Sequence, residues 1–212
     1  MSPIEIIVAA VLIVLSYVAG SIPFGVVVAK ATGAPDPRTL GSGRTGGTNA
    51  LRAMGRQRAL LVVTGDVLKG TLPVIVARIL TGNAGIEVVC AAAAVLGATR
   101  SMFVGFKGGR GVGTSVGTMA AIFWPALLVG FPIFIGVILA TRYVSLGSLL
   151  ATAGGGSVVV VAVAVSGGAV PAAYAAYAVA GVSLVWFAHT DNIRRLLSHT
   201  ERKFDLDLLS RD

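Results

Sequence analysis

Long apolar stretches dominate the chain, and short segments that hold most of the charged residues separate them. The apolar stretches cover residues 4–29, 59–80, 85–104, 112–140, 146–165 and 171–189. They lack the alternation of β-barrel strands, and several are long enough for a helix to cross a bilayer core of about 30 Å. The pattern predicts an all-α integral membrane protein with one domain, residues 1–212, in which residues 190–212 form a short cytoplasmic tail.

The stretch at residues 112–140 decides the number of crossings. It exceeds the roughly 20 residues of one helical crossing, and Pro125 interrupts it. Two short helices that break near Pro125 would leave nearly all basic loops on one side, as the positive-inside rule requires. A single crossing would put Arg142 outside and reverse everything after it. We predict seven transmembrane helices with short glycine-rich cytoplasmic loops, the N-terminus outside and the C-terminus inside.

Composition supports this fold class. The chain is 55% hydrophobic and only 12% charged, whereas soluble domains have about 25% charged residues. The net charge of +8 follows from the basic cytoplasmic loops, so we expect no nucleic-acid partner. Cys90 is the only cysteine, which excludes an intrachain disulfide. Two histidines without an acidic cluster predict no metal site.

Two glycine-rich segments carry the candidate chemistry: GSGRTGGTNALRAMG (41–55) and FKGGRGVGT (106–114). The first contains G-x-G-x-x-G, but a dinucleotide fold needs a preceding strand, and a P-loop needs Lys where Gly47 stands. Both nucleotide interpretations are therefore rejected. Exposed backbone N–H groups and a helix start still favour anion binding. Because both loops emerge on one face, we predict a site for one substrate with two anionic groups, or for two anionic substrates.

The order of six motifs resembles the bacterial acyl-phosphate-dependent glycerol-3-phosphate acyltransferases. The similarity runs nearly the full length and implies a seven-helix inner-membrane enzyme with its site at the cytoplasmic surface. It also implies acyl transfer from acyl phosphate to the 1-hydroxyl of glycerol 3-phosphate, which gives lysophosphatidic acid, with no cofactor or metal. The motifs are GSIPFG (20–25), GSGRTGGTNALRAMG (41–55), DVLKG (66–70), FKGGRGVGT (106–114), RYVSL (142–146) and HTDNIRRLL (189–197).

The motif positions and the cations of the two loops define the expected site. His189 is either an orienting ligand, which we favour, or a general base, and the substrate phosphate is an alternative proton acceptor. We place Arg56 at the membrane surface and expect a monomer surrounded by membrane lipids. The expected catalytic residues are Ser42, Arg52, Arg110 and His189, and the expected substrate-binding residues are Gly46, Thr48, Asn49, Lys107, Gly108, Ser145 and Asn192.

Four positions depart from the family pattern. Arg44 replaces an Asn, Ala98 a His, Ser101 a Pro, and Arg110 a Lys. Arginine keeps the charge of lysine but changes the hydrogen-bond geometry, so a related acceptor is an open alternative.

Two other function classes were weighed. A small transporter or lipid flippase would need polar groups near the bilayer centre, and only Asp66 and Lys69 fit that description. Their i, i+3 spacing allows an ion pair, for which we favour a structural role. A non-enzymatic scaffold leaves the two glycine-rich loops unexplained.

The predicted topology has a direct test. With Cys90 replaced by serine, single cysteines at positions 52 and 110 should react with a membrane-impermeant maleimide from the cytoplasmic side only. Opposite sidedness of the two positions would remove the shared site and with it the acyltransferase hypothesis.

Overall fold

A computed structural model describes residues 2–209, and over these residues the chain forms helices and no β-strand, which confirms the predicted all-α class. The α-helices are α1 (Pro3–Ser21), α2 (Phe24–Thr32), α3 (Gly47–Met54), α4 (Arg56–Thr81), α5 (Ala84–Thr99), α6 (Val112–Phe123), α7 (Pro125–Thr141), α8 (Val144–Val165), α9 (Ala172–Ala188) and α10 (Thr190–Leu197). Short 3₁₀ turns cover Pro37–Thr39, Met102–Val104 and Leu206–Leu209.

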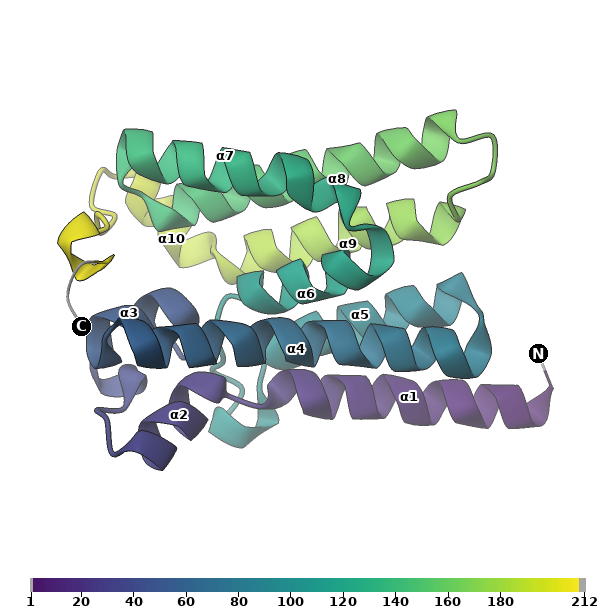
Figure 1. Ribbon diagram of the computed structural model, residues 1–212, viewed down its shortest axis with the longest axis horizontal. Helices are drawn as coiled ribbons and strands as arrows, with labels where there is room; N and C mark the ends of the chain where they lie inside the picture. Colours follow the sequence, from purple (N-terminus) through teal and green to yellow (C-terminus); the bar gives the residue numbers. More distant parts are fainter. Residues whose placement is uncertain (1, 210–212) are drawn as a thin grey trace.

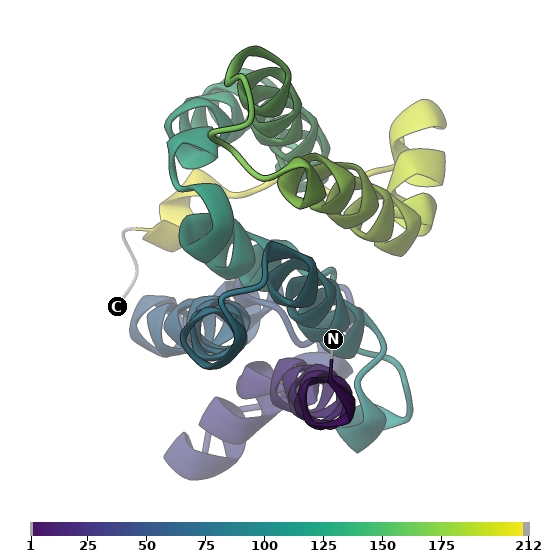
Figure 2. The ribbon, with the colours of Figure 1, turned by 90° about the vertical axis from the view of Figure 1, so that its right-hand side faces the viewer.

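The helices form two groups that lie side by side (Figures 1 and 2). In one group α4 packs against α1, α5 and α6, and in the other α8 packs against α7 and α9. Contacts of α5 with α9 and of α6 with both α7 and α9 join the groups. The short helices α3 and α10 lie at the same end of the molecule, away from the start of α1 (Figure 1).

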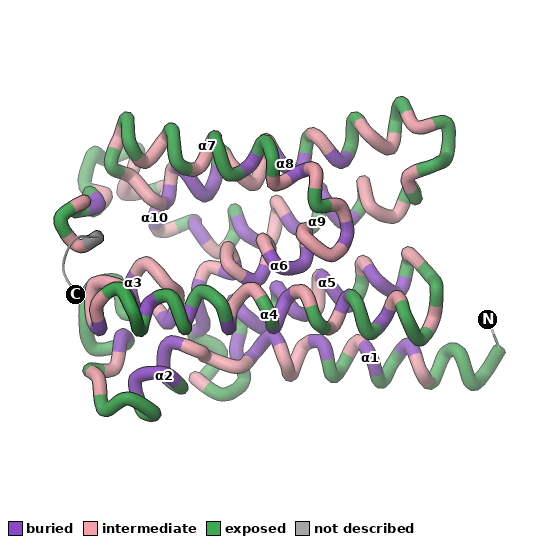
Figure 3. The backbone as a smooth tube through the Cα atoms, in the orientation of Figure 1, coloured by how far each residue is buried: buried purple, intermediate pink, exposed green. Residues whose placement is uncertain are grey.

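Helix length supports a membrane-spanning protein without fixing the number of crossings. Among the described residues, four helices are long and apolar enough to span a bilayer: α1, α4, α5 with the turn after it, and α8. The bent pair α9 and α10, which meet at 63°, adds a fifth candidate, and α6 and α7 are shorter apolar helices. Exposed positions follow the outer sides of α1 and α7 (Figure 3).

Prolines break two of the predicted stretches. The expected hairpin in residues 112–140 is present, because α6 ends at Phe123 and α7 begins at Pro125. The first stretch, predicted as one span over residues 4–29, is instead two helices that break around Pro23. Proline lacks an N–H donor and disfavours helical backbone at the residue before it. The span prediction was therefore wrong beyond Ser21.

Small residues set the spacing between helices. A Cβ atom built on Gly117 of α6 would lie 2.0 Å from the carbonyl oxygen of Val67, and one on Gly70 of α4 would lie 2.2 Å from that of Thr114. Only glycine permits this approach of α4 and α6, as in many membrane helix pairs. The close approach places the start of α6, and the loop before it, beside α4.

An ion pair holds the break between α1 and α2. Lys69 Nζ lies 2.7 Å from Asp66 Oδ1 and donates to the carbonyl oxygen of Ile22 at 2.8 Å. The same ammonium group lies 5.8 Å from the centroid of the Phe24 ring. The predicted pair is present, and its contact with Ile22 gives it the structural role that the spacing suggested.

Replacing Lys69 by methionine should destabilise the protein strongly. The change leaves Asp66 as an uncompensated buried charge, and breaking such a pair costs about 3–5 kcal/mol. Thermal unfolding in detergent, followed by tryptophan fluorescence, should show the loss, and Asp66→Asn in the same chain should recover part of it. The exposed Lys30 is a matched control. Equal effects of Lys30→Met and Lys69→Met would contradict the structural role of the Asp66–Lys69 ion pair.

Candidate active site

A cavity of about 760 Å³ lies between the two helix groups. Its polar end is formed by the first glycine-rich loop with α3, by the second glycine-rich loop, by the start of α8, and by α10 and the tail. From there it continues along apolar side chains of the spanning helices. The polar lining includes Ser42, Arg44, Thr48, Asn49, Arg52, Arg110, Ser145, His189, Asn192 and Glu201, and the apolar lining includes Val67, Met119, Leu127, Phe131, Phe134 and Val182.

Asn49 shapes the first loop from inside. Its Nδ2 donates to the carbonyl oxygens of Pro37 at 2.6 Å, Leu40 at 3.1 Å and Arg44 at 2.9 Å. Its Oδ1 accepts from the backbone N–H of Ser42 at 2.9 Å. The side chain is buried, and both polar atoms of its amide bond to the backbone of the loop. Asn49 was predicted to bind substrate, and in the structure it positions the loop.

The start of α3 faces the cavity. Gly46 is the N-cap residue of this helix, and Gly46, Gly47 and Thr48 all line the cavity. Backbone N–H groups in the first turn of a helix have no helical acceptor, and the helix dipole favours an anion there. The predicted positions Gly46 and Thr48 therefore lie where an anionic group can be received.

The second loop differs in part from expectation. The N–H of Gly108 donates to the carbonyl oxygen of Thr99 at 3.2 Å, so this N–H is not free to join an anion pocket as predicted. Lys107 is exposed and is not among the residues that line the cavity. This loop folds back onto the end of α5, which no local sequence pattern indicates. The loop contributes Gly109, Arg110 and Gly111 to the lining instead.

Arg110 is paired with an acidic residue that the sequence analysis missed. Its Nη1 contacts Asp191 Oδ1 and the carbonyl oxygen of Ala188, and its Nη2 lies 2.7 Å from Asp191 Oδ2. The hydrogen bonds from Arg110 hold the pKa of the Asp191 carboxyl well below its usual range. These contacts of the Arg110 guanidinium connect the second loop to the junction of α9 and α10.

Glu201 connects three predicted or neighbouring site residues. Its Oε1 accepts from Ser145 Oγ at 2.9 Å and from Asn192 Nδ2 at 2.6 Å, and its Oε2 accepts from Arg195 Nε at 2.7 Å. The side chain is only 7% exposed. The sequence analysis assigned this region to a short cytoplasmic tail, and only the acidic residue directly before Arg202 and Lys203 could have drawn attention to it.

His189 and Asn192 each have one acceptor atom to which no described residue donates a hydrogen bond. Because the carbonyl oxygen of Val185 can only accept, the 2.8 Å contact with His189 Nδ1 places the proton on that nitrogen and leaves Nε2 as the acceptor. No described residue bonds to Nε2. Asn192 Oδ1 is buried without a hydrogen-bond partner among the described residues. Both residues line the cavity. Nε2 of His189 is an acceptor to which a hydroxyl donor can bind, whereas Asn192 Oδ1 is enclosed by the protein.

Three arginines of the first loop and α3 region also line the cavity: Arg44, Arg52 and Arg56. Arg56 was placed at the membrane surface from sequence, but it belongs to the lining, because α4 begins at this residue beside α3. Arg52 has no carboxylate within 4.0 Å in residues 2–209, and burial lowers the pKa of its half-buried guanidinium. A cation without a protein partner at a cavity wall suits an anionic ligand.

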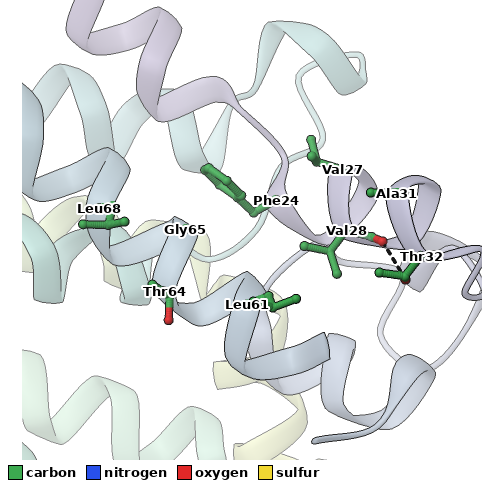
Figure 4. Close-up of a pocket in the computed structure, with 9 residues that line it drawn as sticks. All are labelled: Phe24, Val27, Val28, Ala31, Thr32, Leu61, Thr64, Gly65 and Leu68. Carbon is green, nitrogen blue, oxygen red and sulfur yellow. Dashed lines mark hydrogen bonds between the residues drawn. The ribbon is translucent and has the colours of Figure 1, made fainter. Parts of the chain in front are cut away.

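A second hollow lies between α2 and α4 and is almost entirely apolar (Figure 4). Its volume is about 340 Å³. The two threonines in it offer little chemistry, since Thr32 Oγ1 already donates to the carbonyl oxygen of Val28 at 2.8 Å. The large cavity is therefore the candidate active site.

A family model described as glycerol-3-phosphate acyltransferase matches residues 10–199. The chain belongs to this family. A glycerol-3-phosphate acyltransferase of Rubrobacter xylanophilus is 41% identical over 193 residues, which cover 91% of this chain and 94% of that one. One of Geobacter sulfurreducens is 38% identical over 203 residues, which cover 92% and 96%.

Solved structures of the same family have this fold. The crystal structure of PlsY, an integral membrane glycerol 3-phosphate acyltransferase, in its glycerol 3-phosphate form matches with a TM-score of 0.86 and 36% identity, over 96% of this chain and 99% of that one. The lysophosphatidic acid form matches with a TM-score of 0.84 and 34% identity, over the same shares. The protein is therefore an integral membrane acyltransferase, and the resemblance recognised from its motifs is confirmed.

The departures from the family pattern have structural partners in this acyltransferase. Ser101, which stands where the family has Pro, is buried and donates from Oγ to the carbonyl oxygen of Ser21. The carbonyl oxygen of Ala98, where the family has His, accepts from the N–H of Gly109 at 2.9 Å. Both contacts hold the segment between α5 and α6 against the rest of the protein.

Glu201→Gln should disable the site while leaving the shape of the side chain nearly unchanged. One half of the new amide is a donor and cannot accept from Arg195, and a lost hydrogen bond to a charged group costs about 1.5–3 kcal/mol. We expect at least a roughly tenfold fall in acyltransferase rate together with a lower unfolding temperature. Glu5→Gln, at the exposed start of α1, is the matched control, and identical behaviour of the two variants would argue against the role of Glu201.

Proposed function

We propose that the protein transfers a fatty acyl group from acyl phosphate to the 1-hydroxyl of glycerol 3-phosphate, releasing lysophosphatidic acid and phosphate. The observation that carries the proposal is the cavity itself, which joins a polar end lined by arginines to an apolar interior between helices. Two of these arginines, Arg44 and Arg52, have no carboxylate within 4.0 Å in residues 2–209. The two similar PlsY structures are a glycerol 3-phosphate form and a lysophosphatidic acid form. A phosphorylated acceptor and an acylated phosphorylated product both fit such a lining.

The apolar part of the cavity suits a fatty acyl chain. Met119, Phe131, Phe134 and Val182 line it from three different helices. Burial of a methylene group contributes about 0.8 kcal/mol, so an extended chain gains most of its binding energy there. The polar end then receives the phosphoryl groups, with Arg52, Thr48 and the first turn of α3 as ligands.

The reaction needs alignment and charge stabilisation more than a covalent intermediate. The hydroxyl oxygen attacks the acyl carbonyl carbon, a new C–O ester bond forms, and the C–O bond to phosphate breaks with the electron pair leaving on phosphate. The free acceptor Nε2 of His189 holds the attacking hydroxyl, whose proton passes to this nitrogen or to a substrate phosphate, and Asn192 lines the same part of the cavity. Backbone N–H groups and cations placed in advance stabilise the charge that develops on oxygen.

The arrangement in the membrane follows from charge. Seven crossings, with the N-terminus outside and the cavity mouth in the cytoplasm, put the basic loops on the inner side of the cell membrane. Both glycine-rich loops contribute to one cavity, which supports their location on one face. In this proposal Ser42, at the mouth, completes the catalytic set with Arg52, Arg110 and His189, and a single copy of the chain is sufficient.

The transporter alternative loses much of its basis in the structure. Asp66 and Lys69 do line the cavity, but they are bonded to each other and to the α1–α2 break. A transported ion would have to displace that contact and open the fold. The acyltransferase proposal needs no such opening.

The reaction is tested with purified protein in detergent. Palmitoyl phosphate and glycerol 3-phosphate together should release phosphate, each alone should not, and palmitoyl-CoA in place of palmitoyl phosphate should give no acylated product. Product from palmitoyl-CoA at a comparable rate would contradict the proposed donor.

Arg52→Ala should lower kcat/KM about a hundredfold or more, since a charge-assisted contact to phosphoryl oxygens is lost. Arg58→Ala is the control, because Arg58 is exposed and lies outside the cavity lining. It should stay within about twofold of the unmodified protein, as surface substitutions usually do. Equal losses in the two variants would refute the assignment of Arg52.

A further inference from the structure

Arg44 is a cavity-lining cation to which neither the motif positions nor the mechanism gives a role. Its guanidinium is half-buried and makes one hydrogen bond, from Nη1 to the carbonyl oxygen of Gly108 at 3.3 Å. In the part of the chain that the structure describes, no carboxylate lies within 4.0 Å of it. A guanidinium has five N–H donors, so most of its hydrogen-bonding capacity is unused.

The backbone of Arg44 is held in place before any ligand arrives. The carbonyl oxygen of Arg44 accepts from Asn49 Nδ2 at 2.9 Å, and the neighbouring Thr45 is buried. The guanidinium reaches from the first glycine-rich loop to the carbonyl oxygen of Gly108 in the second. A ligand that binds here meets a group already ordered by folding, which lowers the entropic cost of binding.

The surroundings leave this charge unbalanced. Arg110 lies close enough to Arg44 to repel it. Asp191 attracts Arg44, but its two oxygens are already bonded to Nη1 and Nη2 of Arg110. Burial lowers the pKa of Arg44, and the field of Arg110 lowers it further. Removing a charge from water without a partner is costly, and a bound anion removes that cost.

We propose that Arg44 binds a phosphoryl group of a substrate at the polar end of the cavity. Arginine presents paired N–H groups that match phosphoryl oxygens, and the corresponding pair on Arg110 is occupied by Asp191. The identity of the phosphoryl compound rests on the proposed function, because both glycerol 3-phosphate and acyl phosphate carry such a group.

Steady-state kinetics of Arg44→Gln test the proposal. Each substrate is varied while the other is saturating, and the KM of one of them should rise about tenfold to a hundredfold, the loss expected for one charge-assisted contact. The KM that moves identifies the ligand, and kcat should change far less. Arg44→Lys, which keeps the charge without the fork, should recover part of the affinity. Two unchanged KM values, with or without a fall in kcat, would overturn the proposal and leave Arg44 as a tether to Gly108.

Arg38→Gln is the matched control on the same loop. Arg38 is paired with Asp36 at 2.6 Å and lies outside the cavity lining, so both KM values should stay within about twofold. A rise in KM for Arg38→Gln equal to that for Arg44→Gln would also overturn the proposal.

A binding measurement separates this inference from the proposed reaction. Inorganic phosphate and glycerol 3-phosphate should each raise the unfolding temperature of the unmodified protein and of Arg38→Gln, and raise that of Arg44→Gln much less. If no turnover of palmitoyl phosphate is seen, the proposed donor fails, but this difference still supports Arg44. Equal stabilisation of Arg44→Gln, or no stabilisation of the unmodified protein by either ligand, would overturn the inference.

Discussion

A guanidinium that is buried away from water needs hydrogen-bond acceptors, and this requirement organises the polar end of the cavity. Arg110 receives both oxygens of Asp191, and Arg195 receives Glu201. Arg44 and Arg52 receive no carboxylate in the described residues. The paired arginines therefore build the wall of the cavity, and the unpaired ones face the space that a ligand fills.

Two side chains, Asn49 and Glu201, each bond to several segments at the polar end of the cavity. Asn49 gathers the backbone of the first loop with a neutral amide. Glu201 gathers Ser145 from α8 and Asn192 and Arg195 from α10 with a carboxylate. Irregular backbone at membrane depth is tolerated only when its polar groups are satisfied by the protein or line a cavity. The hydrogen bonds of Asn49 and Glu201 let two glycine-rich loops approach each other without leaving their peptide groups unsatisfied.

The sequence predicted what depends on local pattern. Apolar stretches and prolines gave the helical class and the break between α6 and α7, and motif order gave the family. Hydrogen bonds and ion pairs between residues far apart in the chain could not be predicted from the sequence. Asp191 and Glu201 looked like ordinary tail residues, because their partners come from α8 and from the loop before α6. Lys107 and Gly108 were misplaced because the loop folds back on Thr99, and Arg56 because α3 and α4 meet at Gly55.

The place of Glu201 in the chain has a consequence for biosynthesis. It follows all ten α-helices in the sequence, and Phe204, whose N–H bonds to the carbonyl oxygen of Arg142 at 2.6 Å, comes later still. During translation every apolar helix is thus available for insertion before the acceptor shared by Ser145 and Asn192 emerges from the ribosome. The hydrogen bonds that Glu201 accepts from Ser145 and Asn192 therefore form only after the apolar helices have been synthesised.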